Sequence, residues 1–92
     1  MNHFINHLKI MDVDALMGSI QLFSFLFAPT GWMSCEGQIL QIAQNQALFS
    51  LLSNTYGGDG RTTFGLPNLN GASPLPAMKY YIAVQGIYPS RS

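Results

Sequence analysis

The sequence predicts an α+β fold in which a small mixed sheet of short strands carries one packed helix. Apolar and polar residues alternate over residues 19–23 and 79–85, as they do along half-buried strands. Leucines recur at helical spacing within residues 44–53. Stretches rich in glycine, proline and asparagine at residues 54–60 and 65–76 favour irregular connections.

The first half of the chain predicts three short strands. Residues 19–23 form the first, with its apolar side chains on one face. The turn residues 29–31 end it, and a second short strand follows at residues 32–35. A tight turn at residues 36–37 then leads into a third at residues 38–40.

The predicted helix spans residues 44–53. Its apolar residues share one stripe and are Ala47, Leu48, Phe49, Leu51 and Leu52. Asn45 is a candidate N-cap, although residues 41–44 could equally lead into the helix. Residues 54–60, with three glycines, stop the helix. Residues 62–64 are β-prone but short, and residues 79–85 form the clearest strand. The pairing of the first strand with the last is one arrangement that the pattern leaves open.

Composition limits the classes of partner. The chain has 92 residues, enough for one domain, and its net charge is zero. Nucleic acid is excluded as a partner because phosphate binding needs a basic face. Only 9% of the residues are charged and 48% are hydrophobic, so we expect a partner or a second copy to cover apolar surface. No apolar run approaches the ~20 residues of a membrane span.

Residues 1–16 differ in character from the rest. They hold both histidines and two of the four acidic residues, with no clear period. They also lack the continuous apolar stretch of a signal peptide. We expect them to form an N-terminal leader outside the domain, which then spans residues 17–92. A chain that starts at Met17 should therefore fold and melt close to the full chain.

Catalytic chemistry finds little support in the sequence. Cys35 is the single cysteine, and a small buried hydrophobe is the more frequent role for such a residue. Ser34 or Cys35 would need a base, but His3 and His7 lie in the leader. The two histidines also have no carboxylate or thiol beside them to complete a metal site. We predict no enzymatic activity, no cofactor and no metal.

The run Gly57, Gly58, Asp59, Gly60 and Arg61 superficially resembles a phosphate-binding loop. It lacks the Lys-Ser/Thr ending, and no helix follows it to present N–H groups to an anion. We predict a structural loop in which the glycines allow a sharp path. The Asp59 and Arg61 side chains are then available to bond local backbone groups or each other.

The chain has too many aromatic residues for one small core to hide. Alternation places Tyr80 and Tyr81 on opposite faces of the last strand, so one of the two is a candidate for a subunit interface. Tyr88, in the tail that follows, is a third candidate.

Several motifs occur together and in order. Ala-Pro-Thr-Gly-Trp at residues 28–32 precedes Cys-Glu-Gly-Gln at residues 35–38. Tyr-Gly-Gly-Asp-Gly-Arg-Thr-Thr-Phe follows at residues 56–64, and a closing strand and tail occupy residues 81–91. In these blocks the chain resembles the phage tail-collar family, which includes the microcystin-dependent proteins and the collars of short tail fibres.

The chain departs from the family pattern after residue 65. Asn68, Asn70 and Ala72 stand where many relatives have an aspartate and two arginines. The chain also runs from Gly71 to the closing strand in a few residues, without the long insertion of many relatives. It therefore resembles a minimal form, without the parts that read receptors in fibre proteins.

The resemblance implies a structural or assembly module of a phage-tail-like fibre or related particle. It implies a location in a phage tail or tail-like particle. The partners would be the chain itself, as a homotrimer by analogy with threefold fibres, and tail or fibre proteins. The alternative is a small glycan- or peptide-binding module on a particle or cell surface, which would use exposed aromatic residues and Asn/Gln-rich loops.

Overall fold

The computed structural model describes residues 15–24 and 28–89 of the chain. These residues hold five strands, one 3-10 helix and one α-helix, which confirms the α+β class. In chain order the elements are β1 (Ile20–Phe23), β2 (Trp32–Ser34), β3 (Ile39–Gln41), η1 (Ile42–Gln44), α2 (Gln46–Leu52), β4 (Thr63–Gly65) and β5 (Lys79–Ala83). The strands form two small sheets, and their pairings are antiparallel.

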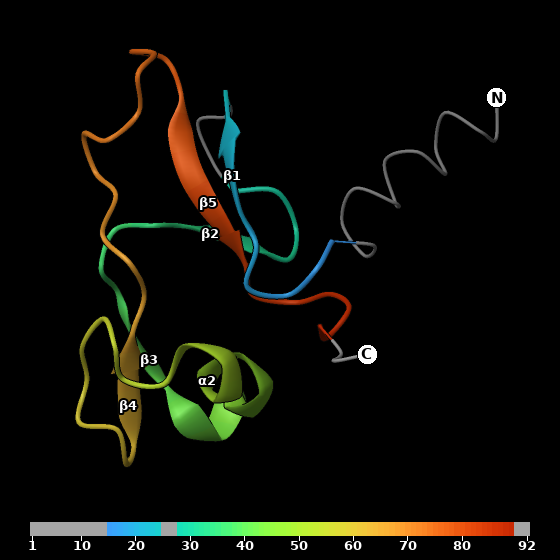
Figure 1. Cartoon of the computed structure of the whole chain (residues 1–92), viewed down its shortest axis with the longest axis vertical. Helices are drawn as coiled ribbons and strands as arrows, with labels where there is room; N and C mark the ends of the chain where they lie inside the picture. Colours follow the sequence, from blue (N-terminus) through green and yellow to red (C-terminus); the bar gives the residue numbers. More distant parts are fainter. Residues whose placement is uncertain (1–14, 25–27, 90–92) are drawn as a thin grey trace, which may run out of the picture.

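Strand β5 lies in the middle of the larger sheet, between β1 and β2 (Figure 1). Ile20 of β1 pairs with Ile82, and Trp32 of β2 pairs with Ala83. The first and last predicted strands are therefore neighbours. Since a central strand can be covered on both faces, Tyr81, Ile82 and Ala83 are all buried.

Strand β5 ends at Ala83, before the alternation in the sequence ends. The N–H groups of Val84 and Gln85 both donate to the carbonyl of Gly31, at 2.9 and 3.3 Å. One carbonyl thus takes both donors, which is incompatible with a continued ladder. The apolar pattern therefore runs past the end of the regular strand.

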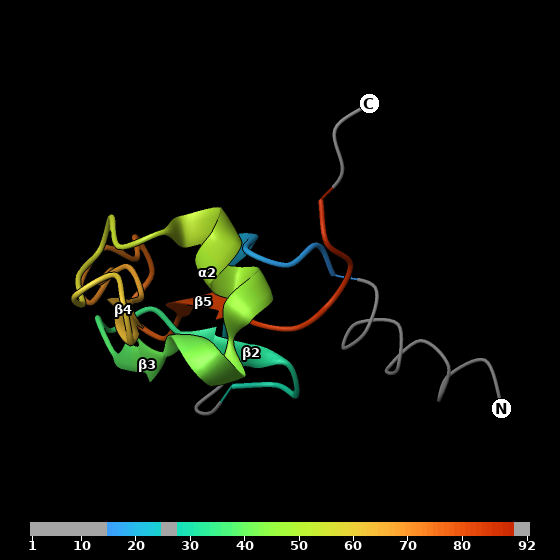
Figure 2. The ribbon, with the colours of Figure 1, turned by 90° about the horizontal axis from the view of Figure 1, so that it is seen from below.

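The second sheet pairs β3 with β4, and α2 lies beside it (Figure 2). The rings of Phe49 from α2 and Phe64 from β4 meet edge to face, with their centroids 5.4 Å apart. Such contacts are favourable beyond the apolar area they bury. This ring pair anchors the helix to the sheet.

The α-helix begins later than predicted because residues 42–44 form the 3-10 turn η1. Asn45 occupies the N-cap position of α2 but makes no side-chain capping bond. Its Nδ2 instead donates to the carbonyl of Gln41 at 2.9 Å. The prediction of a side-chain cap is wrong because this amide closes the preceding turn.

The core consists of two clusters on either side of β5. The first contains Cys35, Leu48, Phe64, Leu66 and Ile82. The second contains Trp32, Tyr81 and Ala83. In the predicted helical stripe Leu48 is fully buried and Leu51 and Leu52 are half-buried, whereas Ala47 is exposed. Strand β5 supplies Ile82 to one cluster and its neighbours to the other.

Residues that precede Met17 in the described part already contact the folded domain. The carbonyl of Ala15 accepts the N–H of Ile87 at 2.8 Å, and Leu16 forms a parallel bridge with Ile87. Ala15 also packs against the cluster around Trp32. Ala15 and Leu16 therefore contact the domain, the boundary at Met17 stays a prediction, and residues 1–14 lie outside the described part. In that part, no helix is long and apolar enough to cross a membrane.

Candidate functional site

The loop of residues 57–61 is organised by the carboxylate of Asp59. Its Oδ1 accepts the backbone N–H groups of Arg61, Thr62 and Thr63 at 2.8, 2.8 and 3.0 Å, and its Oδ2 accepts the Thr62 hydroxyl at 3.0 Å. The N–H of Arg61, followed by those of Thr62 and Thr63, holds the pKa of Asp59 well below its usual range. The aspartate bonds local backbone groups, which is one of the two roles expected of it.

Two glycines let this loop lie directly on β4. A Cβ at Gly58 would come within 2.6 Å of the Phe64 nitrogen and the Thr63 carbonyl oxygen, and φ at Gly58 is +84°. A Cβ at Gly65 would come within 2.6 Å of the Tyr56 carbonyl oxygen. No side chain fits at these approaches. The contacts support a structural role for the loop.

A hollow of about 260 Å³ opens between the end of β2, the connection that follows β4 and the start of β5. Its polar lining consists of Ser34, Glu36, Asn70, Ser73 and Lys79. Its apolar lining consists chiefly of Leu69, Leu75, Pro76, Met78 and Tyr80. The hollow therefore has one polar and one apolar set of groups.

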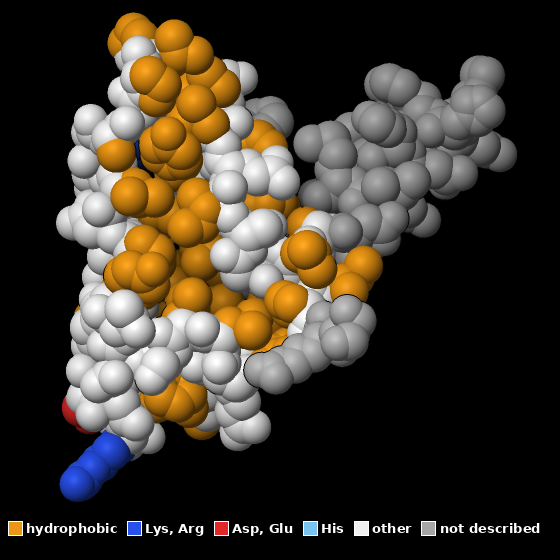
Figure 3. Space-filling view, in the orientation of Figure 1, with side chains coloured by type: hydrophobic (Ala, Val, Ile, Leu, Met, Phe, Trp, Pro, Cys, Tyr) orange, Lys and Arg blue, Asp and Glu red, His pale blue; other side chains and the backbone are white. Residues whose placement is uncertain are grey.

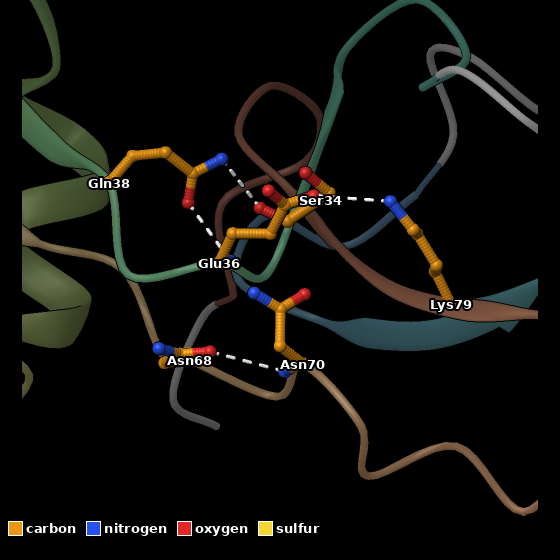
Figure 4. Close-up of polar contacts among 6 residues, drawn as sticks. All are labelled: Ser34, Glu36, Gln38, Asn68, Asn70 and Lys79. Atoms are coloured by element: carbon orange, nitrogen blue, oxygen red, sulfur yellow. Dashed lines mark hydrogen bonds and ion pairs between the residues drawn. The ribbon is translucent and has the colours of Figure 1, made fainter.

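A connected row of polar groups lies at the hollow (Figure 4). The Lys79 Nζ is 3.4 Å from the Glu36 Oε2, and both side chains are open to solvent. The Ser34 hydroxyl, followed by the Lys79 charge, lowers the pKa of Glu36. The Gln38 side chain accepts the N–H of Glu36 at 3.0 Å and donates to the Ser34 carbonyl at 2.8 Å. The row is thus held by the backbone as well as by charge.

Asn68 and Asn70, in the segment that departs from the family pattern, have different roles. Asn68 Oδ1 accepts the N–H of Asn70 at 3.1 Å, and Asn68 forms a backbone bridge with Glu36. The N–H of Leu69 donates to the Cys35 carbonyl at 2.8 Å. Backbone bonds therefore tie down the segment without the charges of the family pattern. Within residues 15–24 and 28–89 the Asn70 side-chain amide has no hydrogen bond.

A comparison with known protein families finds a match for this chain. The sequence model of the phage tail collar domain matches residues 18–74, more than half of the chain. The chain belongs to the phage tail collar domain family. The match confirms the resemblance; it runs from β1 through β4, includes the Asp59 loop, and stops before β5. A comparison with curated proteins finds no match.

The two nucleophile candidates of this collar domain, Cys35 and Ser34, have no histidine base within the described part. Cys35 is buried, and burial raises the pKa of its thiol to about 11, so the thiol is protonated near neutral pH. The Ser34 hydroxyl donates a hydrogen bond to the Glu36 carboxylate (Figure 4). His3 and His7 lie outside the described residues. In the described part, no three histidine, cysteine or acidic side chains gather at one point.

The three candidate interface tyrosines of the collar domain have three different environments. Tyr81 is 1% exposed and packs beside Trp32 and Phe23, so it belongs to the core of the subunit and leaves Tyr80 as the candidate of the two. The reason is that β2 and β1 flank β5 and the core covers both faces. Tyr80 is half-buried at the hollow. Tyr88 is exposed, and its hydroxyl hydrogen-bonds that of Ser50.

Proposed function

We propose that this collar domain is a non-catalytic assembly module of a phage-tail-like fibre or a related particle. It works as a homo-oligomer, and a trimer follows from the threefold fibres that the family resemblance implies. Tail or fibre proteins are its further partners. The family match supports the tail-fibre context, and the exposed apolar residues near the chain ends support self-association.

The assembly surface is the terminal patch, made of Leu16, Ile87 and Tyr88. These side chains are 51%, 53% and 47% exposed. The Leu16–Ile87 bridge brings the two segments together. Fully burying one side chain of this size is worth roughly 1.5–3 kcal/mol, so covering the exposed halves of three is worth roughly 2–5 kcal/mol per subunit. A closed cyclic arrangement would cover the patch on every copy.

Light scattering after size exclusion tests the assembly. We expect a particle near three times the 10.1 kDa of one chain. Tyr88→Asp places a charge in the terminal patch and should dissociate the particle while the subunits stay folded. Tyr56→Asp is the matched control, because Tyr56 is 50% exposed and belongs to another part of the chain. A wild-type mass of one chain at high concentration would overturn the proposal.

A further inference from the structure

The surface hollow carries a balanced set of polar groups that no packing requirement explains. Glu36 supplies an acceptor, Lys79 a donor of opposite charge, and the Asn70 amide offers both donor and acceptor without a bond in the described part. Figure 4 shows these side chains in one region, carried by different segments. A ligand that both donates and accepts at several points would satisfy them together.

The other groups of the hollow are apolar. Leu75 is 51% exposed, Tyr80 and Met78 are half-buried, and all three line the hollow. Figure 3 shows hydrophobic side chains gathered in a band on one face of the molecule. Binding sites for small molecules combine an apolar lining with a few placed polar groups. The hollow has this composition.

We propose that the hollow binds a single ring of a neutral sugar. The ring hydroxyls would each donate and accept among Glu36, Asn70 and Lys79, and the C–H face of the ring would pack on Leu75 and Tyr80. The volume of about 260 Å³ lies just below the roughly 300–1,000 Å³ of drug-sized sites, which suits one ring rather than a long chain.

Charge selects neutral ligands over ions. Glu36 and Lys79 lie 3.4 Å apart and cancel, so an anion would meet the carboxylate and a cation would meet the ammonium. A ligand with either single charge would have to separate the pair. A neutral polyhydroxylated ring bonds both groups and leaves them together.

An extended peptide fits less well because several backbone N–H groups beside the hollow already have partners. The N–H of Cys35 donates to Tyr80 at 3.0 Å, that of Leu69 to Cys35 at 2.8 Å, and that of Met78 to Leu75 at 3.2 Å. Strand addition needs a row of free backbone donors and acceptors. The Asn70 side-chain amide, which has no bond within the described part, can instead serve a hydroxyl as donor and acceptor.

Titration of the full ¹⁵N-labelled chain with glucose, galactose, N-acetylglucosamine and glucuronate tests the site. We expect at least one neutral sugar to bind with a dissociation constant on the order of 1 mM, as a ligand of this size reaches at ordinary efficiency. The shifted amide signals should belong to residues 34–36 and 69–80. Absence of shifts with every neutral sugar, or shifts confined to other residues, would overturn the site.

Variants separate the site from a general surface effect. Asn70→Ala should weaken binding of the sugar about tenfold, whereas Gln46→Ala, an exposed amide on α2, should leave it unchanged. Glu36→Gln keeps the hydrogen-bonding shape but leaves Lys79 unbalanced, so preference should move toward glucuronate. Equal binding by wild type and Asn70→Ala would refute the assignment. The hollow shares no residue with the terminal patch, so loss of assembly in Tyr88→Asp leaves this result independent.

Discussion

Replacing Gly58 by alanine tests whether the glycine loop is a packing device. Gly58 and Gly71 have nearly the same φ, at +84° and +78°. A Cβ at Gly71 meets nothing within 4 Å, whereas one at Gly58 lies 2.6 Å from the Phe64 nitrogen and the Thr63 oxygen. Gly71→Ala therefore measures the backbone penalty alone, and the difference between the two variants measures the contact with β4.

The two costs follow from these contacts. At Gly71 a left-handed alanine costs about 1–2 kcal/mol, partly offset by the lower entropy of the unfolded chain. At Gly58 the loop must also move off β4, because Phe64 is fully buried and cannot shift alone. That movement strains the bonds from Gly65 to Gly57 and from Gly60 to Thr63, each 2.9 Å. The two weakened hydrogen bonds cost about 1 kcal/mol each, and overpacking costs about 1–3 kcal/mol. Gly58→Ala should therefore lower the free energy of unfolding by roughly 3–5 kcal/mol more than Gly71→Ala does.

Urea unfolding at one fixed protein concentration measures this difference. Trp32, the single tryptophan, is buried and reports on unfolding through its fluorescence. We expect a small fall in midpoint for Gly71→Ala and a large fall for Gly58→Ala, with similar slopes. Equal midpoints for the two variants would show that β4 accommodates the methyl group and that the close approach carries no energetic weight.

Two further predictions concern the loop carboxylate and the domain boundary. The folded pKa of Asp59 lies below its unfolded value of about 3.9, so its stabilisation is present above that pH and lost as pH falls. The gap in urea midpoint between wild type and Asp59→Asn should thus narrow from pH of about 7 to about 2; a constant gap would contradict this. A chain starting at Met17 loses the Ala15–Ile87 bond and the contact of Ala15 with the core, so it should be about 1–2 kcal/mol less stable than one starting at Ala15. Thermal melts of the two chains test this, and equal melting temperatures would support the boundary at Met17.

The regular elements could be predicted because local patterns suffice for them. Alternation located β1 and β5, and the leucine spacing located α2, with its start displaced by a 3-10 turn. The division of the strands into two sheets has no local signal. Strands such as β3 and β4 are three residues long and depend on partners distant in sequence.

The environment of each site residue was less accessible to sequence reasoning. Alternation separates Tyr80 from Tyr81 but cannot tell which side is covered, since a central strand is buried on both faces. The hollow escaped prediction because Glu36 and Lys79 are 43 positions apart and no motif joins them. The four charged residues of the described part, Glu36, Asp59, Arg61 and Lys79, have no regular spacing that would pair these two. Only the path of the chain after β4 brings them together.

The central place of β5 has a consequence for how the domain folds and for what it tolerates. Strands β1 and β2 do not pair with each other, so the larger sheet forms only when β5 inserts between them (Figure 1). The segment from Gly71 to β5 is part of the loop that this step closes. The entropic cost of closing a loop grows by only about 0.6 kcal/mol for each doubling of the loop length. Extra sequence at Gly71, where the backbone is exposed and uncrowded, would thus slow closure slightly without altering the contacts that complete the sheet.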